Sequence, residues 1–211
     1  MELGKQFRTD SSAVFLIISN LITIVLAVYE KWDLSEIMWI YWGQSVIIGY
    51  FNWKRILDLN QFSTSGFQIN DQPTKPTKKT QKVTATFFAV HYGFFHLVYS
   101  VFLFDQTHSF SSNTLLFILL CVVIFFFNHR FSYFHNRERD MNRTPNIGTI
   151  MFFPYLRIIP MHLTIIIGSS FGKGSSWALI LFLGLKTIAD LIMHMIEHAE
   201  ARQKKNQFFN K

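Results

Sequence analysis

The chain has 211 residues, of which half are hydrophobic and 24 are Phe. Only 16% are charged, against about 25% in a typical soluble domain, so the composition excludes an ordinary soluble protein. The single cysteine, Cys121, excludes a disulfide framework and a cysteine-based zinc site. The net charge of +7 requires no nucleic-acid partner, because basic residues at a membrane surface face anionic lipid.

Six apolar segments follow one another along the chain. Each is about 18 to 25 residues long, and at about 1.5 Å per residue such a helix crosses a hydrocarbon core of about 30 Å. They cover residues 12 to 29, 34 to 53, 83 to 104, 114 to 134, 148 to 171 and 176 to 198. We therefore predict an all-α fold, a single bundle of six transmembrane helices over residues 1–211, in the cell membrane.

The connections between these segments alternate in charge. Basic residues gather before the first segment, in the second and fourth connections and in the tail, whereas the other three connections contribute only Lys31 and Lys173. The positive-inside rule then predicts that both termini are cytoplasmic. The second connection, from about 58 to 82, is rich in Ser, Thr, Pro, Gln and Lys, and we predict a mobile cytoplasmic loop there.

Two prolines, Pro154 and Pro160, interrupt the fifth segment. Because proline has no N–H, they are expected to bend this helix and to free the carbonyls of residues 150 and 156. The bend makes room for Arg157, which at this depth needs an acidic partner. Asp190 and Glu36 are the available acids, and Asp190 matches better by depth. The mixed charges of residues 137 to 143, just before this segment, predict solvated ion pairs.

Histidines within apolar segments are the sharpest functional signal, because ionisable side chains in hydrocarbon usually mark a site. Measured by helical rise, His91, His129 and His194 share a layer about 8 to 12 Å from the cytoplasmic side. Asp190 lies about one turn deeper than His194, and His198 about one turn shallower. Two further histidines lie deeper and are expected to form a separate polar contact: His96 and His162.

Three or four imidazoles with a carboxylate form a ligand set for Zn²⁺, with Fe or Mn as alternatives when more oxygen ligands join. We predict a metal site of His91, His129, His194 and His198. Asp190 is the candidate catalytic residue, as the base on a bound water, although it also suits a ligand or a partner that orients an imidazole. A zinc-dependent hydrolase acting on a lipid or membrane substrate would follow.

The same residues allow a non-catalytic interpretation. A hydrogen bond from Asp190 to a histidine or to Lys186 satisfies the carboxylate without any metal. The protein is then a transporter or a membrane assembly protein with a buried His and Arg network or an ion path, and a haem held by two histidines is a third option. The partners predicted are membrane lipid and no nucleic acid, and a homo-oligomer stays open.

Three strings carry a resemblance to a known family. They are Tyr41-Trp42-Gly43-Gln44-Ser45-Val46-Ile47-Ile48-Gly49-Tyr50-Phe51-Asn52, His91-Tyr92-Gly93-Phe94-Phe95-His96, and Lys186-Thr187-Ile188-Ala189-Asp190 followed by His194 and His198. They resemble an uncharacterised prokaryotic membrane family, domain of unknown function 6498. The resemblance implies a multi-pass protein of a prokaryotic inner membrane with no known activity, and an acid is expected in that family where Gln44 stands.

A looser similarity is to the membrane zinc hydrolases that include alkaline ceramidases and adiponectin receptors. Those proteins carry His-x-x-x-His on their last helix, as His194 and His198 do here. The chain departs from them in having six predicted spans where they have seven. It also has Phe87 where their pattern places a Ser ahead of the first histidine.

Overall fold

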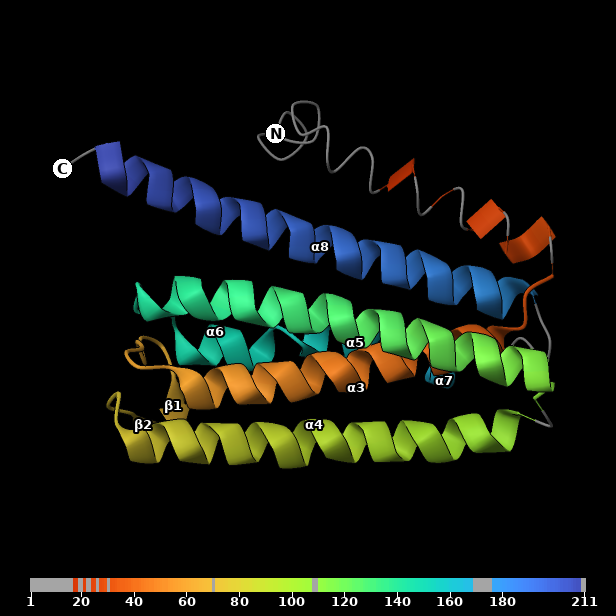
Figure 1. Ribbon diagram of the computed structural model, residues 1–211, viewed down its shortest axis with the longest axis horizontal. Coiled ribbons are helices and arrows are strands. Elements are labelled where there is room, and N and C mark those ends of the chain that lie inside the picture. Colours follow the sequence, from red (N-terminus) through yellow and green to blue (C-terminus); the bar gives the residue numbers. More distant parts are fainter. Residues whose placement is uncertain are drawn as a thin grey trace. The chain divides into compact units, whose positions relative to one another are not determined.

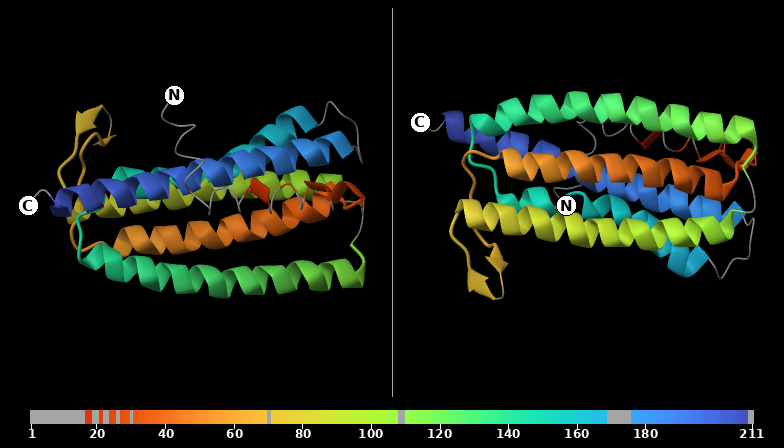
Figure 2. Two further views of the ribbon diagram at one scale, coloured as in Figure 1. Left: turned by 90° about the horizontal axis from the view of Figure 1, so that it is seen from above. Right: turned by 60° about the horizontal axis from the view of Figure 1, so that its bottom comes forward.

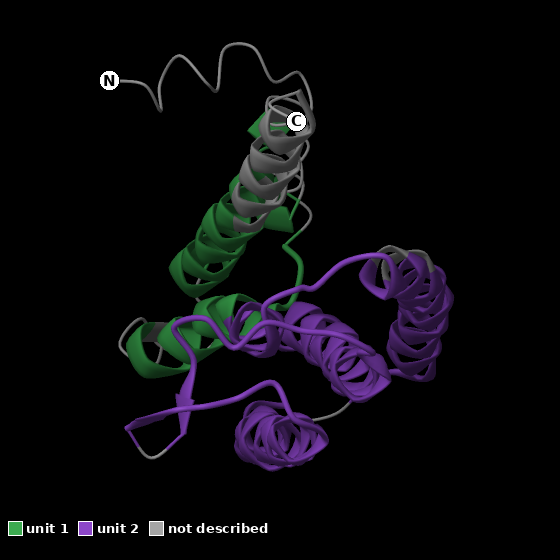
Figure 3. Ribbon diagram, turned by 90° about the vertical axis from the view of Figure 1, so that its left-hand side faces the viewer, with its two compact units in different colours: residues 1–34, 156–211 green, residues 35–155 purple. Residues whose placement is uncertain are grey.

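The structure is a computed structural model that describes residues 17–18, 21, 24–25, 27–29, 31–69, 71–107, 110–168 and 176–209. For residues 135, 136, 139, 168, 193, 194 and 196–209 the description covers the backbone alone. The chain divides into two compact units, residues 35–155 and residues 1–34 with 156–211, shown in Figure 3. Each unit is described here by itself.

Long helices make up most of the described chain (Figure 1). Residues 35–155 hold most of α3 (Leu34–Asp58), together with α4 (Lys78–Gln106), α5 (Ser112–Met141) and the short α6 (Ile147–Phe152). The other unit holds α7 (Tyr155–Gly168) beyond its first residue and α8 (Ser176–Phe209). A hairpin of two short strands, β1 (Gln68–Ile69) and β2 (Gln72–Pro73), lies between α3 and α4 in the sequence.

Within residues 35–155, α3 lies between α4 and α5, as two views in Figure 2 agree. The buried positions of α4 recur every three or four residues, which gives the helix one inward face. Phe88, Tyr92 and Leu103 are among them. The α5 helix differs, because only 6% of its most apolar stretch is buried and its Leu and Phe side chains are exposed around most of the helix.

Three helices in the described part of the chain are long and apolar enough to cross a membrane. They are Lys78–Gln106, Ser112–Phe134 and Ile147–Ile167, the last made up of α6 and most of α7, and they overlap the third, fourth and fifth predicted segments. The predicted second segment is also helical, as α3, but its Trp, Tyr, Gln and Asn residues lower its mean hydropathy. The last segment lies within α8, and the first falls mostly outside the described residues. The apolar helices are those of a membrane protein.

Hydrogen bonds hold parts of the segment from 58 to 82, for which composition predicts a mobile cytoplasmic loop, and the mobility itself stays a prediction. Ser63 pairs with the start of α6, its N–H donating to Pro145 O at 2.9 Å and its carbonyl accepting from Ile147 N at 3.0 Å. Thr64 Oγ1 donates to Thr74 O at 2.6 Å and closes the hairpin. Ser and Thr hydroxyls bond nearby backbone groups readily, so the same composition that indicates disorder also supplies these turns.

Candidate functional site

The predicted transmembrane segment that carries the prolines is broken in two. Its first part, α6, ends at Phe152, and α7 begins at Tyr155 after Phe153 and Pro154. Proline lacks the N–H that would bond to the carbonyl four residues earlier, so Ile150 O has no helical donor from that position. The Asn52 side chain of α3 takes this role, donating from Nδ2 to Ile150 O at 3.0 Å. The predicted freeing of carbonyl 150 is thereby confirmed, and the donor comes from a different helix.

Polar side chains of α4 lie beside the break. His91 Nδ1 and Tyr155 Oη form a hydrogen bond of 3.0 Å. The Tyr155 ring meets the ring of Tyr92 edge-on, with centroids 5.4 Å apart, and the ring of Phe88 in the same way at 5.9 Å. The imidazole of His91 is stacked on Phe87 at 5.1 Å. An imidazole and a phenol are thus held together among aromatic rings at an irregular point of an apolar helix.

After His91 on α4, Tyr92 and His96 take part in a second set of polar contacts, which joins α4 to α3. The Tyr92 hydroxyl donates to Ser45 O at 3.1 Å, so in its 2.8 Å contact with Ser45 Oγ it acts as the acceptor. The indole N–H of Trp42 donates to His96 O at 2.9 Å. His96 Nδ1 lies 2.8 Å from Tyr92 O, and since a carbonyl only accepts, Nδ1 carries the hydrogen. The separate polar contact expected for His96 is therefore present.

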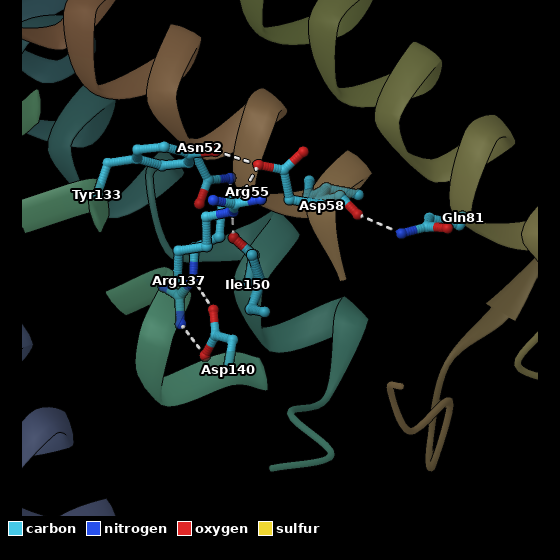
Figure 4. A network of polar contacts seen from close by, with 9 residues as sticks. Asn52, Arg55, Asp58, Gln81, Tyr133, Arg137, Asp140 and Ile150 are labelled. Atoms are coloured by element: carbon cyan, nitrogen blue, oxygen red, sulfur yellow. Dashed lines mark hydrogen bonds and ion pairs between the residues drawn. The ribbon is translucent and has the colours of Figure 1, made fainter. Parts of the chain in front are cut away.

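The basic end of α3 carries a charged network, drawn in Figure 4. Arg55 binds Asp140 of α5 through two contacts, Nε to Oδ2 at 2.5 Å and Nη2 to Oδ1 at 3.0 Å. Arg137 Nε lies 3.3 Å from Asp58 Oδ2, and the Tyr133 hydroxyl donates to the same carboxylate. Asp140 is buried, so the solvated ion pairs expected for residues 137 to 143 do not describe it. The reason is that its partner comes from α3 and not from its own connection.

A buried glutamine closes the same end of α3. Gln81 Nε2 lies 2.8 to 3.1 Å from three carbonyls at the C-terminal end of α3, those of Ile56, Leu57 and Leu59. The last carbonyls of a helix have no partners within the helix, so a side-chain amide satisfies them. This contact ties the beginning of α4 to the end of α3.

The structure does not bring the predicted metal ligands together in its described part. His91 bonds to Tyr155, and His129 lies partly buried on α5. Among the described side chains, no three His, Cys, Asp or Glu residues form a group that could hold a metal ion. His194 and His198 lie on α8, but their side chains are outside the described residues, so the four-histidine set stays a prediction.

Asp190, the predicted catalytic residue, has a partner on its own helix. Lys186 Nζ lies 2.7 Å from Asp190 Oδ2, four residues away, which is the metal-free alternative that the sequence allows. No ion pair joins Asp190 to Arg157 in the part of the chain that the structure describes. His162, which sequence depth grouped with His96, is exposed on α7.

Sequence reasoning missed several polar residues of α3 that bond to other helices. Asn52, Ser45 and Arg55 act through partners 47 to 98 residues away, and no local pattern reveals such partners. Their spacing on α3 does carry a signal, because residues 45, 52 and 55 fall on neighbouring turns of one helix.

A comparison with curated proteins and one with solved structures each gave no match. The similarity to alkaline ceramidases and adiponectin receptors therefore stays a prediction. A family described as a family of unknown function, DUF6498, matches residues 2–207. Because this match covers nearly the whole chain and agrees with the three strings quoted above, the chain belongs to the DUF6498 family.

Proposed function

We propose that the protein is a membrane transporter that moves protons along a polar column, formed by side chains of α3 and by the His91–Tyr155 pair beside it, with six membrane-crossing helices and both termini in the cytoplasm. The observation that carries the proposal is the broken helix at Phe153 and Pro154, where an interhelical amide, an imidazole and a phenol converge. In transporters, discontinuous helices lie at the binding site, because irregular backbone at membrane depth is tolerated only within protein or beside a cavity.

The column follows one side of α3. Trp42, Ser45, Asn52 and Arg55 each make a hydrogen bond or an ion pair to another element, and Gly49 among them lets the ring of Tyr92 approach. From residue 42 to residue 55 this distance is about 20 Å at 1.5 Å per residue, or roughly two thirds of a hydrocarbon core. Hydroxyl, phenol and imidazole groups both donate and accept protons, which suits them to a proton path.

Ion pairs lie at one end of the column. Arg55 with Asp140, and Asp58 with Arg137 and Tyr133, join α3 to α5 beyond Asn52. Ion pairs that exchange partners are one way in which packed helices take up two discrete arrangements. In this proposal, the network is the cytoplasmic gate of the column.

Proton flux into liposomes tests the proposal. Purified protein is reconstituted in liposomes that contain a pH-sensitive dye, and a potassium diffusion potential is applied. We expect acidification well above that of empty liposomes, and a decrease of at least tenfold in His91→Phe and in Tyr155→Phe, since each removes one side of the same hydrogen bond.

His162→Phe is the matched control, because it makes the same exchange at an exposed histidine of α7 outside the column. It is expected to keep the flux of the unmodified protein. Flux equal to that of empty liposomes, or flux that is unchanged in both His91→Phe and Tyr155→Phe, would reject proton transport through this column.

Metal binding is a second candidate function, favoured by the geometry of α8. This helix runs without a break from Ser176 to Phe209, so His194 and His198 have the i, i+4 spacing of a metal half-site. Elemental analysis of purified protein, after growth with added Zn or Fe, is expected to give close to one metal ion per chain. That metal should be lost in His194→Ala and kept in His162→Ala. A metal-free protein after supplementation would sink this candidate.

A further inference from the structure

The charges at the basic end of α3 and α5 are neutralised unequally. Arg55 and Arg137 are paired with Asp140 and Asp58. Lys54 and Arg130, which lie on the same two helices, form no ion pair with any carboxylate that the structure describes. Two positive charges are therefore left uncompensated beside a network that balances its own.

Aromatic rings hold these two cations. Lys54 Nζ lies 5.7 Å from the centroid of the Tyr133 ring, and Arg130 Cζ lies 5.5 Å from that of Phe134. The two rings are neighbours, with centroids 5.2 Å apart. Cation–π contacts of this length position a charge without neutralising it. Lys54 and Arg130 thus belong to one aromatic patch, which Tyr133 and Phe134 form.

The patch stands at the end of an apolar surface. The membrane-crossing stretch of α5 ends at Phe134, so both cations lie at the level expected for lipid headgroups. Two exposed aromatic side chains of α5 lie near Arg130: Phe131 follows it directly and is 75% exposed, and Phe127, about one turn farther from the end of the apolar stretch, is 60% exposed. Positive charge next to exposed aromatic side chains complements a molecule that has an anionic head and hydrocarbon tails.

We propose that Lys54 and Arg130 bind the headgroup phosphate of an anionic phospholipid, whose acyl chains lie on the exposed face of α5. The occupant is a lipid and not a free phosphate, because the apolar surface continues directly from the cations. This goes beyond proton transport, because neither Lys54 nor Arg130 contributes to the column, although the Tyr133 ring beside Lys54 also joins the charged network through its hydroxyl.

Native mass spectrometry of the detergent-purified protein tests the proposal, with phosphatidylglycerol and phosphatidylcholine offered at equal concentration. We expect preferential retention of phosphatidylglycerol. Affinity should fall about fivefold in Lys54→Gln or in Arg130→Gln, and about twentyfold in the double variant, since a basic residue near an anionic membrane surface contributes a factor of this size. The charge-keeping pair Lys54→Arg with Arg130→Lys should retain binding.

The control is Lys79→Gln with Lys82→Gln, which removes two exposed lysines of α4 at the same end of the chain's helices. It should retain the preference for phosphatidylglycerol. Equal retention of both lipids, or unchanged affinity in the two single variants, overturns the proposal. Displacement of the lipid by millimolar inorganic phosphate also overturns it, because a headgroup contact alone would then explain the binding. The single variants keep the test decisive if the double variant does not fold.

Discussion

Asp140→Ala is expected to lower the free energy of unfolding by about 2 to 3 kcal/mol, which is somewhat less than the loss on breaking a fully buried ion pair. The side chains of Arg55 and Asp140 are 26% and 11% exposed, so water compensates the remaining charge only in part. Removing the carboxylate leaves the Arg55 guanidinium without two of its contacts. Unfolding of the purified protein by a denaturing detergent, followed by circular dichroism, measures the change.

Glu138→Ala is the matched control, because Glu138 is an exposed acid on the same helix two residues away. Its effect should stay within about 0.5 kcal/mol. A double-mutant cycle with Arg55→Met isolates the pair: the double variant should be more stable than the sum of the two single losses predicts. Equal stability of Asp140→Ala and Glu138→Ala would contradict the ion pair as a link between α3 and α5.

This ion pair also shows where sequence reasoning ends. The charged run at residues 137 to 143 is visible in the sequence, but Asp140 bonds to Arg55, 85 residues earlier. Local composition indicates only partners that are close in the sequence, so it predicts that Asp140 forms a solvated ion pair within its own connection. One cue was present, since Arg55 and Asp58 mark the end of one helix and the run at 137 to 143 marks the end of another.

The lengths of the apolar segments and the chemistry of proline predicted a larger part of the fold. The third and fourth predicted segments lie within α4 and α5, because uninterrupted apolar stretches leave few alternatives to a helix. The freed carbonyl of Ile150 was also predicted, since it follows from the missing N–H of Pro154, whereas the bend expected there is an interruption between α6 and α7. The identity of the donor was not predictable, because it depends on which helix packs against α6.

The predicted histidine layer illustrates the same limit. Helical rise gives the depth of a residue, but it does not give the direction in which the side chain points. The side chain of His91 lies beside Tyr155, whereas the ring of His96, five residues later, lies 6.4 Å from the ring of Trp42 on α3. Depth placed His91 in one layer with His129, but His91 bonds to Tyr155 and His129 lies on α5.

The hydrogen bonds between Ser45 of α3 and Tyr92 of α4 require the two helices to approach closely, and a glycine makes this approach possible. A Cβ atom placed on Gly49 would lie 2.5 Å from Tyr92 Cε1 and 2.8 Å from Cδ1. The Tyr92 ring cannot move away freely, since its hydroxyl bonds to Ser45 and its face is stacked on His96 at 4.4 Å. Any side chain at position 49 must therefore separate the helices or displace the tyrosine.

Gly49→Ala is accordingly expected to destabilise the protein by about 1 to 3 kcal/mol, the usual cost of overpacking a core. Gly93→Ala on α4 provides a control of opposite sign, because nothing lies within 4 Å of the added methyl group there. With alanine favoured over glycine in a helix interior, Gly93→Ala should raise stability by up to about 1 kcal/mol. Both are measured by the same detergent unfolding. If Gly49→Ala proved as stable as Gly93→Ala, then α3 and α4 would not be in contact at Tyr92, and the Ser45 hydrogen bonds on which the proposed column depends would be lost with that contact.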